Sequence, residues 1–200
     1  MSQNTITVSA GGVSTSIKVK RPKFNDLVIP YKIVDSKKPT KEELKESRLI
    51  VKDEFGNILE DRTHCLRFKK VHPDLYERCL NDESAYQNTC ATRMSYAFNN
   101  GGYKITSGEF NDIYSHAKIF ASITGIIKFL KKQFGASDIN FDGNINHFKS
   151  KIAGKKGIII LLIKWDDANG HVTLWDGKKC VDNTNHFLDT PSDILFWELK

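Results

Sequence analysis

An uninterrupted apolar run near the C-terminus is the feature that most constrains the fold of this chain. Residues Gly157–Ile163 read Gly-Ile-Ile-Ile-Leu-Leu-Ile, and charged residues bound the run on both sides. The run is far too short to span a bilayer, which requires about 20 apolar residues. A continuous apolar segment of this length instead predicts a central strand that is buried on both faces. We therefore expect a globular protein built on a well-anchored sheet.

A hairpin signal follows this run, within Gly170–Asp182. The pair Asp176-Gly177 tolerates the positive φ angles of a two-residue type I′ turn. Counting outward from that turn gives the facing pairs Trp175 and Lys178, Thr173 and Cys180, and His171 and Asp182. Side chains alternate along a strand, so these pairs share one face. The pattern thus predicts an imidazole beside a carboxylate, which together can serve as the base and its orienting group.

The candidate nucleophile is Cys90. It lies at the start of a predicted helix, Asn88–Gly102, which begins with capping residues and ends in a glycine pair. The partial positive charge and the unpaired N–H groups of a first helical turn favour a thiolate and can stabilise an oxyanion. A lone cysteine in this position is more often a packing residue. Combined with His171 and Asp182, however, it predicts a Cys–His–Asp catalytic set.

The other cysteines and histidines have no comparable context. Cys180 shares the His171 face but lacks a helix terminus, so we interpret it as a bystander or a disulfide partner. Cys65 and Cys79 could form a disulfide, which the sequence alone does not decide. Because no CxxC pair or zinc-finger spacing occurs, we expect no metal, and no organic cofactor is needed. The remaining histidines have no partner at a defined spacing: His64, His72, His116, His147 and His186.

A chain of 200 residues can bury one sizeable core. Residues 1–20 are rich in Ser and Thr and could form a hairpin or a tail, of which we favour the tail. The main domain is expected over residues 21–200. Within it, apolar residues recur at three- and four-residue steps from Phe120 to Phe134, and Gly135 follows. This spacing predicts a core-packing helix that ends at the glycine.

The stretch 35–85 has its own pattern and is treated as a possible insertion. Thr40–Glu43 fits a capping box, which predicts a short exposed helix to about Ser47. Leu49–Lys69 is interpreted as strands around a turn at Asp53–Asn57. None of these residues enters the predicted catalytic set.

The net charge of +6 says little by itself about partners. The lysines are spread along the chain and no recognisable nucleic-acid motif accompanies them, so a basic soluble surface is the simpler interpretation. We expect neither a nucleic-acid nor a membrane partner. The N-terminus also lacks the layout of a secretory signal. We therefore expect synthesis in the cytoplasm and export, if any, by a route that does not read such a signal.

Several of these stretches resemble one known family. The fourth family of type VI secretion amidase effectors, which are papain-like, NlpC-type peptidoglycan amidases injected into rival bacteria, has closely similar motifs. The stretches are Asn88–Tyr96, Gly157-Ile158 and Gly170–Gly177. Arg21–Asn25 also looks like the N-terminal segment of that family. The resemblance extends over about Arg21–Val34 and Tyr86–Phe187, in the same order.

The resemblance implies an α+β, papain-like cysteine amidase with its cysteine at a helix N-terminus and its His and Asp on an antiparallel sheet. Cys90 would be the nucleophile, His171 the general base and Asp182 the residue that orients it. The implied reaction is hydrolysis of the γ-D-glutamyl–meso-diaminopimelate bond in peptidoglycan stem peptides. The implied partners are the type VI secretion machinery and a cognate immunity protein, and the implied site of action is the periplasm of the target cell.

Two features depart from the family pattern. Some relatives carry a second cysteine just after the catalytic Asp, in a disulfide with the one before it, whereas Asn183–Asn185 follow here and leave Cys180 without that partner. The stretch Asp35–Ala85 is also longer than expected. Two other functions stay open: a papain-like protease or acyltransferase with a protein substrate, and a catalytically silent binding module on the same fold.

Overall fold

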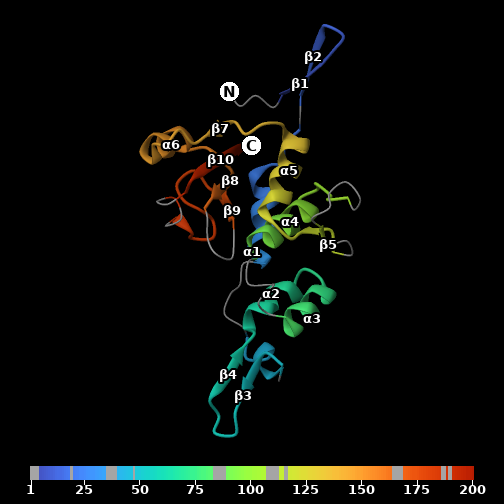
Figure 1. The fold of residues 1–200 in the computed structure, drawn as a ribbon, viewed down its shortest axis with the longest axis vertical. Coiled ribbons are helices and arrows are strands. Elements are labelled where there is room, and N and C mark those ends of the chain that lie inside the picture. Colours follow the sequence, from blue (N-terminus) through green and yellow to red (C-terminus); the bar gives the residue numbers. More distant parts are fainter. Residues whose placement is uncertain are drawn as a thin grey trace.

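The core of the molecule is a four-stranded antiparallel sheet with the strand order β7-β10-β8-β9 (Figure 1). Its strands are β7 (Ile139–Asn140), β8 (Lys156–Leu162), β9 (Gly170–Trp175) and β10 (Asp193–Leu199). The computed structural model describes residues 5–18, 20–34, 40–46, 48–82, 89–106, 113–114, 117–163, 169–185, 188 and 191–200. The combination of helices with an antiparallel sheet makes this the α+β fold that was expected.

Strand β8 is the central strand that the apolar run predicts. It pairs with β10 on one side and with β9 on the other. Ile158 and Ile160 belong to the core on one face of the sheet, and Ile159 and Leu161 belong to the core on the other. All four residues are fully buried. A strand between two neighbours and two cores needs apolar side chains on both faces, which confirms the prediction.

Helices cover the sheet on both sides (Figure 1). The helices that pack on the first face are α1 (Phe24–Val34), α4 (Cys90–Asn100) and α5 (Ile123–Phe134). Helix α6 (Ile145–Ile152) packs on the other face. A short two-stranded ribbon, β5 (Ile113–Tyr114) with β6 (Ile119–Phe120), precedes α5. Among the helices of the described residues, none combines the length and the apolarity needed to cross a bilayer.

Both predicted helices are present, but Phe120, the first apolar residue of the predicted stripe, lies in strand β6 and not in the helix. Helix α5 begins after Ser122, whose hydroxyl accepts a hydrogen bond from the Gly125 N–H at 3.3 Å, and ends at Gly135, which adopts a positive φ of 79°. Helix α4 begins at Cys90 and ends at Asn100, and Gly101 follows as its C-cap residue. Thr89 precedes α4 without a side-chain capping bond, and Asn88 lies outside the described residues.

The N-terminal residues form a hairpin rather than the tail that we favoured. Strand β1 (Thr5–Ala10) pairs with β2 (Val13–Lys18) along its whole length. Gly11 and Gly12 form the two-residue turn, with φ angles of 57° and 80°. A type I′ turn needs positive φ at both central residues, and two glycines adopt it without strain. In Figure 1 this hairpin projects from one end of the molecule.

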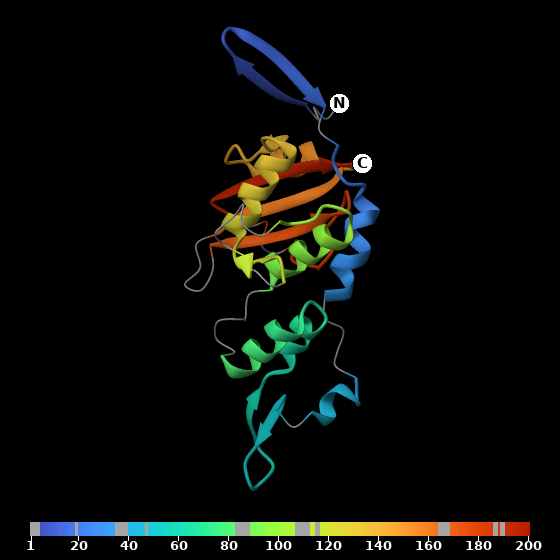
Figure 2. The same cartoon turned by 90° about the vertical axis from the view of Figure 1, so that its right-hand side faces the viewer.

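Residues 40–46 and 48–82 lie at the opposite end of the molecule (Figures 1 and 2). The capping box is present, because the Thr40 N–H donates to the Glu43 carboxylate at 2.8 Å and the Glu43 N–H donates to the Thr40 hydroxyl at 3.2 Å. The helix that follows is only the 3₁₀ turn η1 (Glu43–Lys45). Strands β3 (Ile50–Lys52) and β4 (Ile58–Asp61) then form the predicted hairpin around Asp53–Asn57.

The strands predicted as far as Lys69 stop at Asp61, which corrects that interpretation. The Asp61 carboxylate accepts a hydrogen bond from the Thr63 N–H at 2.9 Å and so starts a helical turn. Three short helices follow: η2 (Thr63–Cys65), α2 (Leu66–Lys69) and α3 (Pro73–Asn81). Their buried residues form a core of their own, which also includes Ile119 of the main domain.

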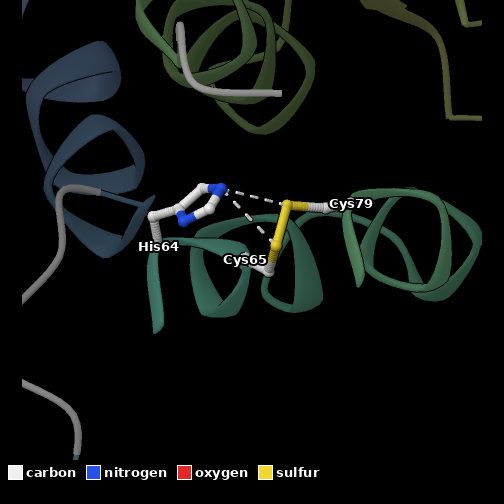
Figure 3. A group of neighbouring side chains, drawn as sticks. All are labelled: His64, Cys65 and Cys79. Carbon is white, nitrogen blue, oxygen red and sulfur yellow. Dashed lines mark hydrogen bonds between the residues drawn. A yellow bond between two sulfur atoms is a disulfide. The ribbon is translucent and has the colours of Figure 1, made fainter. Parts of the chain in front are cut away.

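A disulfide between Cys65 and Cys79 joins η2 to α3 (Figure 3). The two Cα atoms are 5.6 Å apart, and the structure thereby decides the pairing that the sequence left open. The His64 Nε2 atom lies 3.6 Å from the Cys65 sulfur and 3.5 Å from the Cys79 sulfur. Among the described residues these three form a group of metal-ligand types. Both sulfurs are used in the disulfide, so neither is available as a thiolate ligand.

Removing this disulfide is expected to destabilise the protein by about 3 kcal/mol, the chain-entropy value for a loop of this length. The cysteines are 14 positions apart in the sequence. Urea unfolding of the wild type with and without a reductant, beside a Cys65→Ser/Cys79→Ser double variant, measures the effect. The reductant should lower the wild type to the stability of the variant and leave the variant unchanged. Equal stability of all samples would contradict the prediction.

Candidate active site

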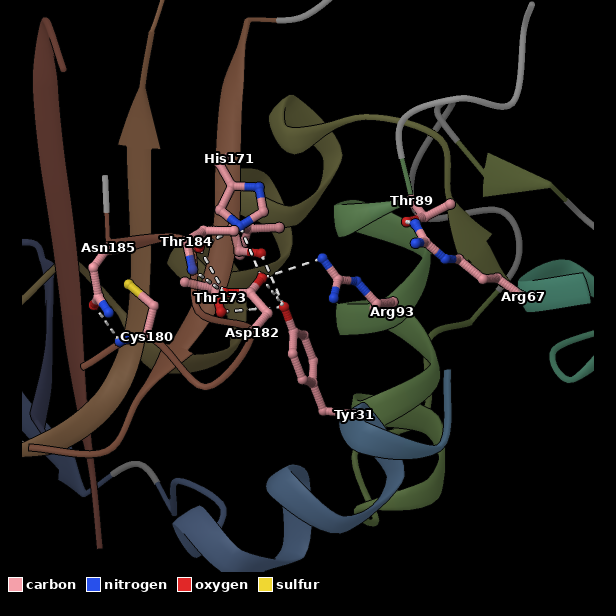
Figure 4. Close-up of polar contacts among 11 residues, drawn as sticks. Tyr31, Arg67, Thr89, Arg93, His171, Thr173, Cys180, Asp182, Thr184 and Asn185 are labelled. Carbon is pink, nitrogen blue, oxygen red and sulfur yellow. Dashed lines mark hydrogen bonds and ion pairs between the residues drawn. The ribbon is translucent and has the colours of Figure 1, made fainter. Parts of the chain in front are cut away.

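Cys90, His171 and Asp182 come together beside edge strand β9. Cys90 is the first residue of α4, His171 is the second residue of β9, and Asp182 lies in the turn beyond Cys180. His171 Nε2 is 2.9 Å from Asp182 Oδ2 (Figure 4). The imidazole is also hydrogen-bonded to the Cys90 side chain. The three residues predicted from the sequence are therefore neighbours, with the imidazole between the sulfur and the carboxylate.

The strand register predicted from Asp176-Gly177 is wrong. Trp175 pairs with Cys180, where it was expected to face Lys178, and the Val181 N–H donates to the Leu174 carbonyl at 2.8 Å. The connection therefore contains four residues, 176–179, and is not a two-residue type I′ turn. The Asp176 carboxylate causes the wider turn, because it accepts hydrogen bonds from the N–H groups of the third and fourth residues of that connection, at 2.9 and 2.8 Å.

His171 and Asp182 meet despite this error because a second turn follows the Trp175–Cys180 bridge. The Asn183 N–H donates to the Cys180 carbonyl at 3.1 Å, and Asn183 adopts a positive φ of 63°. Asp182 lies within this turn and not in a strand, and its carboxylate reaches the imidazole from there. The Thr184 hydroxyl lies 3.1 Å from His171 Nε2.

The Asp182 carboxylate is almost completely enclosed, with 1% of its side chain exposed. Oδ2 accepts hydrogen bonds from His171 Nε2, from the Tyr31 hydroxyl at 2.9 Å and from Arg93 Nη2 at 3.1 Å. Oδ1 accepts one from the Thr184 hydroxyl at 2.6 Å. Burial raises the pKa of this carboxyl, but His171, Arg93 and Thr184 together hold it well below its usual range. Asp182 is therefore ionised at any working pH.

The pKa values of His171 and Cys90 move in opposite directions. Burial lowers the pKa of His171, but its hydrogen bonds to Asp182 and Cys90 outweigh burial and raise that pKa to about 9. Burial likewise raises the pKa of Cys90, but the neighbouring His171, a hydrogen bond from the Val172 backbone and the Arg93 charge lower that pKa below its ordinary value. This combination favours a thiolate–imidazolium pair near neutral pH.

Three residues of the site were not predicted from the sequence: Tyr31, Arg93 and Thr184. Arg93 follows Cys90 by three positions, which places the two on one side of a helix, and this spacing is a signal that could have been used. Thr184 follows Asp182 by two positions, and an Asp side chain commonly bonds the residue two positions on, so this spacing could have indicated Thr184. No local pattern indicates Tyr31, which comes from α1, 151 positions from Asp182.

The competing residues have other roles. Cys180 is a free, fully buried cysteine, and burial raises its pKa to about 12. His72 caps α3 through Nδ1, which accepts from the Asp74 N–H at 3.2 Å. His147 Nδ1 lies 2.6 Å from the Asp142 carboxylate. His116 and His186 lie outside the described residues. Of the candidates described, only Cys90 combines a helix N-terminus with a histidine partner.

Comparisons with known proteins agree on one family. The model of the family described as "Type VI secretion system (T6SS), amidase effector protein 4" (Tae4) matches residues 86–197, more than half of the chain.

The solved structure of the Tae4/Tai4 effector–immunity system of Salmonella typhimurium has 23% identity and a TM-score of 0.64, and the match covers 90% of this chain and all of that one. Tae4 of Enterobacter cloacae has 26% identity and a TM-score of 0.63, with 92% and 100% covered. A Tae4–Tai4 complex of Enterobacter cloacae has 26% identity and a TM-score of 0.64, with 90% and 100% covered. No curated protein sequence matches the chain.

Proposed function

This chain belongs to the Tae4 family of type VI secretion amidase effectors, and from that premise we propose that it is a cysteine amidase acting on peptidoglycan stem peptides. The bond it hydrolyses joins the γ-carboxyl of D-glutamate to the amine of meso-diaminopimelate. The observation that supports this proposal most is the imidazole of His171, which is hydrogen-bonded both to Cys90 and to Asp182. That arrangement supplies a nucleophile, a base and its orienting group for acyl transfer.

The reaction follows from the protonation states of the pair. The Cys90 thiolate attacks the γ-carbonyl carbon, and backbone N–H groups at the start of α4 stabilise the oxyanion. The His171 imidazolium donates its proton to the leaving diaminopimelate amine, which departs and leaves a thioester on Cys90. The neutral imidazole then takes a proton from water, and the resulting hydroxide attacks the thioester. Collapse of this second intermediate expels the Cys90 thiolate beside the imidazolium and releases the γ-carboxylic acid, which then loses its remaining proton to solvent.

Asp182 acts through His171 in this scheme. Its carboxylate binds Nε2, which fixes the imidazole ring and stabilises the positive charge that the ring carries before it protonates the amine. Every group required lies within the proposed catalytic domain, residues 21–200, in which 35–85 would be an insertion. The mechanism needs no cofactor.

The proposed biological role is also inferred from the Tae4 family. The structures of the Salmonella and Enterobacter relatives show Tae4 with the immunity protein Tai4, and we propose that a cognate immunity protein likewise blocks this chain in the cell that makes it. The protein would be made in the cytoplasm, exported by the type VI secretion machinery and active on peptidoglycan in the periplasm of the target cell.

Digestion of purified diaminopimelate-type peptidoglycan tests the reaction. The wild type is expected to produce fragments with a new free amine on diaminopimelate and a free γ-carboxyl on D-glutamate, identified by mass spectrometry. The matched control is His171→Ala, which lacks the base and should yield at least about 10³-fold less product. Identical fragments from both proteins would indicate a contaminating hydrolase. Cleavage of a protein substrate without cleavage of peptidoglycan would favour the alternative function of a papain-like protease. No cleavage of either substrate would favour a catalytically silent binding module.

A further inference from the structure

A second cation, Arg93, lies beside the carboxylate of the site. Its Nη2 atom donates to Asp182 Oδ2 at 3.1 Å, on the same oxygen that binds His171 (Figure 4). The Arg93 side chain is 9% exposed and the Asp182 side chain is 1% exposed. A buried ion pair of this kind is sensitive to the loss of either partner. The mechanism above gives Arg93 no part, although it is one of the most enclosed charges of the site.

The charge on His171 changes during the proposed reaction, whereas the charge on Arg93 does not. Once the imidazolium has protonated the leaving amine, the imidazole is neutral. A buried carboxylate that then had no cation beside it would be strongly disfavoured and would tend to take a proton. Because a guanidinium stays charged at any working pH, Arg93 remains on Oδ2 through that interval. It can therefore keep Asp182 ionised, and aimed at Nε2, when water has to be deprotonated.

The position of Arg93 in the fold supports this role. Arg93 follows Cys90 by one helical turn on α4, so the helix that presents the nucleophile also holds the carboxylate. Tyr31 of α1 keeps the guanidinium in place: its ring centroid is 5.1 Å from Arg93 Cζ, and its hydroxyl donates to the same Asp182 oxygen. Tyr31 itself is fully buried. Tyr31 and Arg93 therefore hold the Asp182 carboxylate in place together.

We propose that Arg93 is a positioning residue of the reaction: it is the permanent counter-ion of Asp182, and Tyr31 holds it in that position. The proposal rests on the proposed function for its effect on turnover. Its effect on Cys90 and His171 can be measured without any substrate.

The direction of the effect follows from the charges around the site. His171 faces Cys90 and Asp182, and Asp182 faces Tyr31, Arg93 and, through a weaker electrostatic interaction, Cys180. Removing the Arg93 charge takes a cation away from the thiolate, so the pKa of Cys90 rises. It also leaves the Asp182 charge less neutralised, so the imidazolium is held more tightly and the pKa of His171 rises as well. In a profile of activity against pH, the rise reports the pKa of Cys90 and the fall reports the pKa of His171. Both should therefore move to higher pH.

The experiment compares Arg93→Met, which removes the charge but keeps most of the volume, with Arg93→Lys, which keeps the charge. The rate of Cys90 alkylation by iodoacetamide is followed against pH, with the modified peptide identified by mass spectrometry. Arg93→Met is expected to raise the alkylation midpoint by about one pH unit and to lower kcat/KM on purified muropeptides by about 10²-fold. Arg93→Lys should keep the midpoint within a few tenths of a unit of the wild type.

The matched control is Arg21→Met. Arg21 is a second buried arginine, and its partners, Asp138 and the Phe134 and Glu198 carbonyls, are not residues of the site. Its loss should therefore cost stability without moving the alkylation midpoint. A folded Arg93→Met protein with the wild-type midpoint would overturn the proposal, and so would an equal shift in Arg21→Met.

A second variant keeps the proposal testable if Arg93→Met does not fold. Arg93→Gln removes the same charge but keeps a hydrogen-bond donor for Asp182 Oδ2, and it should raise the pKa of His171 measured by histidine NMR. An unchanged His171 pKa in Arg93→Gln would then count against the proposal. If the wild type fails to cleave muropeptides, the proposed function fails, yet the alkylation and NMR measurements still decide the role of Arg93.

Discussion

Replacing Cys90 by alanine is expected to abolish peptidoglycan hydrolysis, with kcat/KM at least about 10⁴-fold lower, whereas Cys180→Ala should retain activity within a few-fold. The chain offers this matched pair because both residues are free, buried cysteines. Their electrostatic surroundings differ. Cys90 has a lowered pKa beside His171 at the start of α4, and burial raises the pKa of Cys180 to about 12. Only the first can be a thiolate at neutral pH.

The measurement is the initial rate of release of free diaminopimelate amines, beside alkylation of each cysteine by iodoacetamide at mildly acidic pH. Cys90 should react well ahead of Cys180, and prior alkylation should inactivate the wild type. Two results would overturn the assignment of the nucleophile: substantial activity in Cys90→Ala, or loss of activity in a correctly folded Cys180→Ala protein. Circular dichroism of both variants controls for folding.

The elements that could be predicted from the sequence are those with a strong internal period. Strand β8 is apolar on both faces because it lies between two strands and two cores, and an unbroken apolar run is the direct signature of that position. Helix α5 shows its buried stripe and its glycine stop in the sequence. The helix that begins at Cys90 could be located for the same reason.

The turn after β9 and the region after β4 were misjudged because single side chains control the backbone there. The Asp176 carboxylate accepts hydrogen bonds from two backbone N–H groups and widens the turn, which moves the strand register by two residues. The Asp61 carboxylate accepts a hydrogen bond from one backbone N–H group and starts a helical turn where strands were predicted. Hydrogen bonds between a side chain and the backbone compete with regular strand pairing, and the spacing of apolar residues in the sequence does not reveal them.

The contacts around Asp182 were hidden for a different reason. Tyr31 reaches the carboxylate from 151 positions away and Arg93 from 89. Their proximity follows from how α1 and α4 pack against the sheet, which no local pattern contains. The His171–Asp182 contact was predicted because both residues flank one turn. Asp182 reaches the imidazole from the turn after Cys180 and not from the strand position that was predicted.

Asp182→Ala is expected to cause the other large effect, a loss of about 3 to 5 kcal/mol in the free energy of unfolding together with loss of activity. The substitution leaves Arg93 buried without its counter-ion, and removing one member of a buried pair is costly. It also leaves His171 without the group that orients it. Urea unfolding and muropeptide hydrolysis measure the two effects separately.

Asp138→Ala is the matched control for this prediction, because Asp138 pairs with the buried Arg21 and contacts none of the site residues Cys90, His171 and Asp182 in the described bonds. Both variants should lose stability, but only Asp182→Ala should lose activity under conditions in which both are folded. The pH dependence separates them further. The pKa of Asp182 is lowered on folding, so its contribution to stability is present above the unfolded pKa of about 3.9 and is lost as the pH falls through the folded value. The wild type should therefore lose more stability on acidification than Asp182→Ala does. Equal acid sensitivity of the two proteins would show that Asp182 is not held as a buried anion, and the proposed role of His171 as an imidazolium partner would then lose its support.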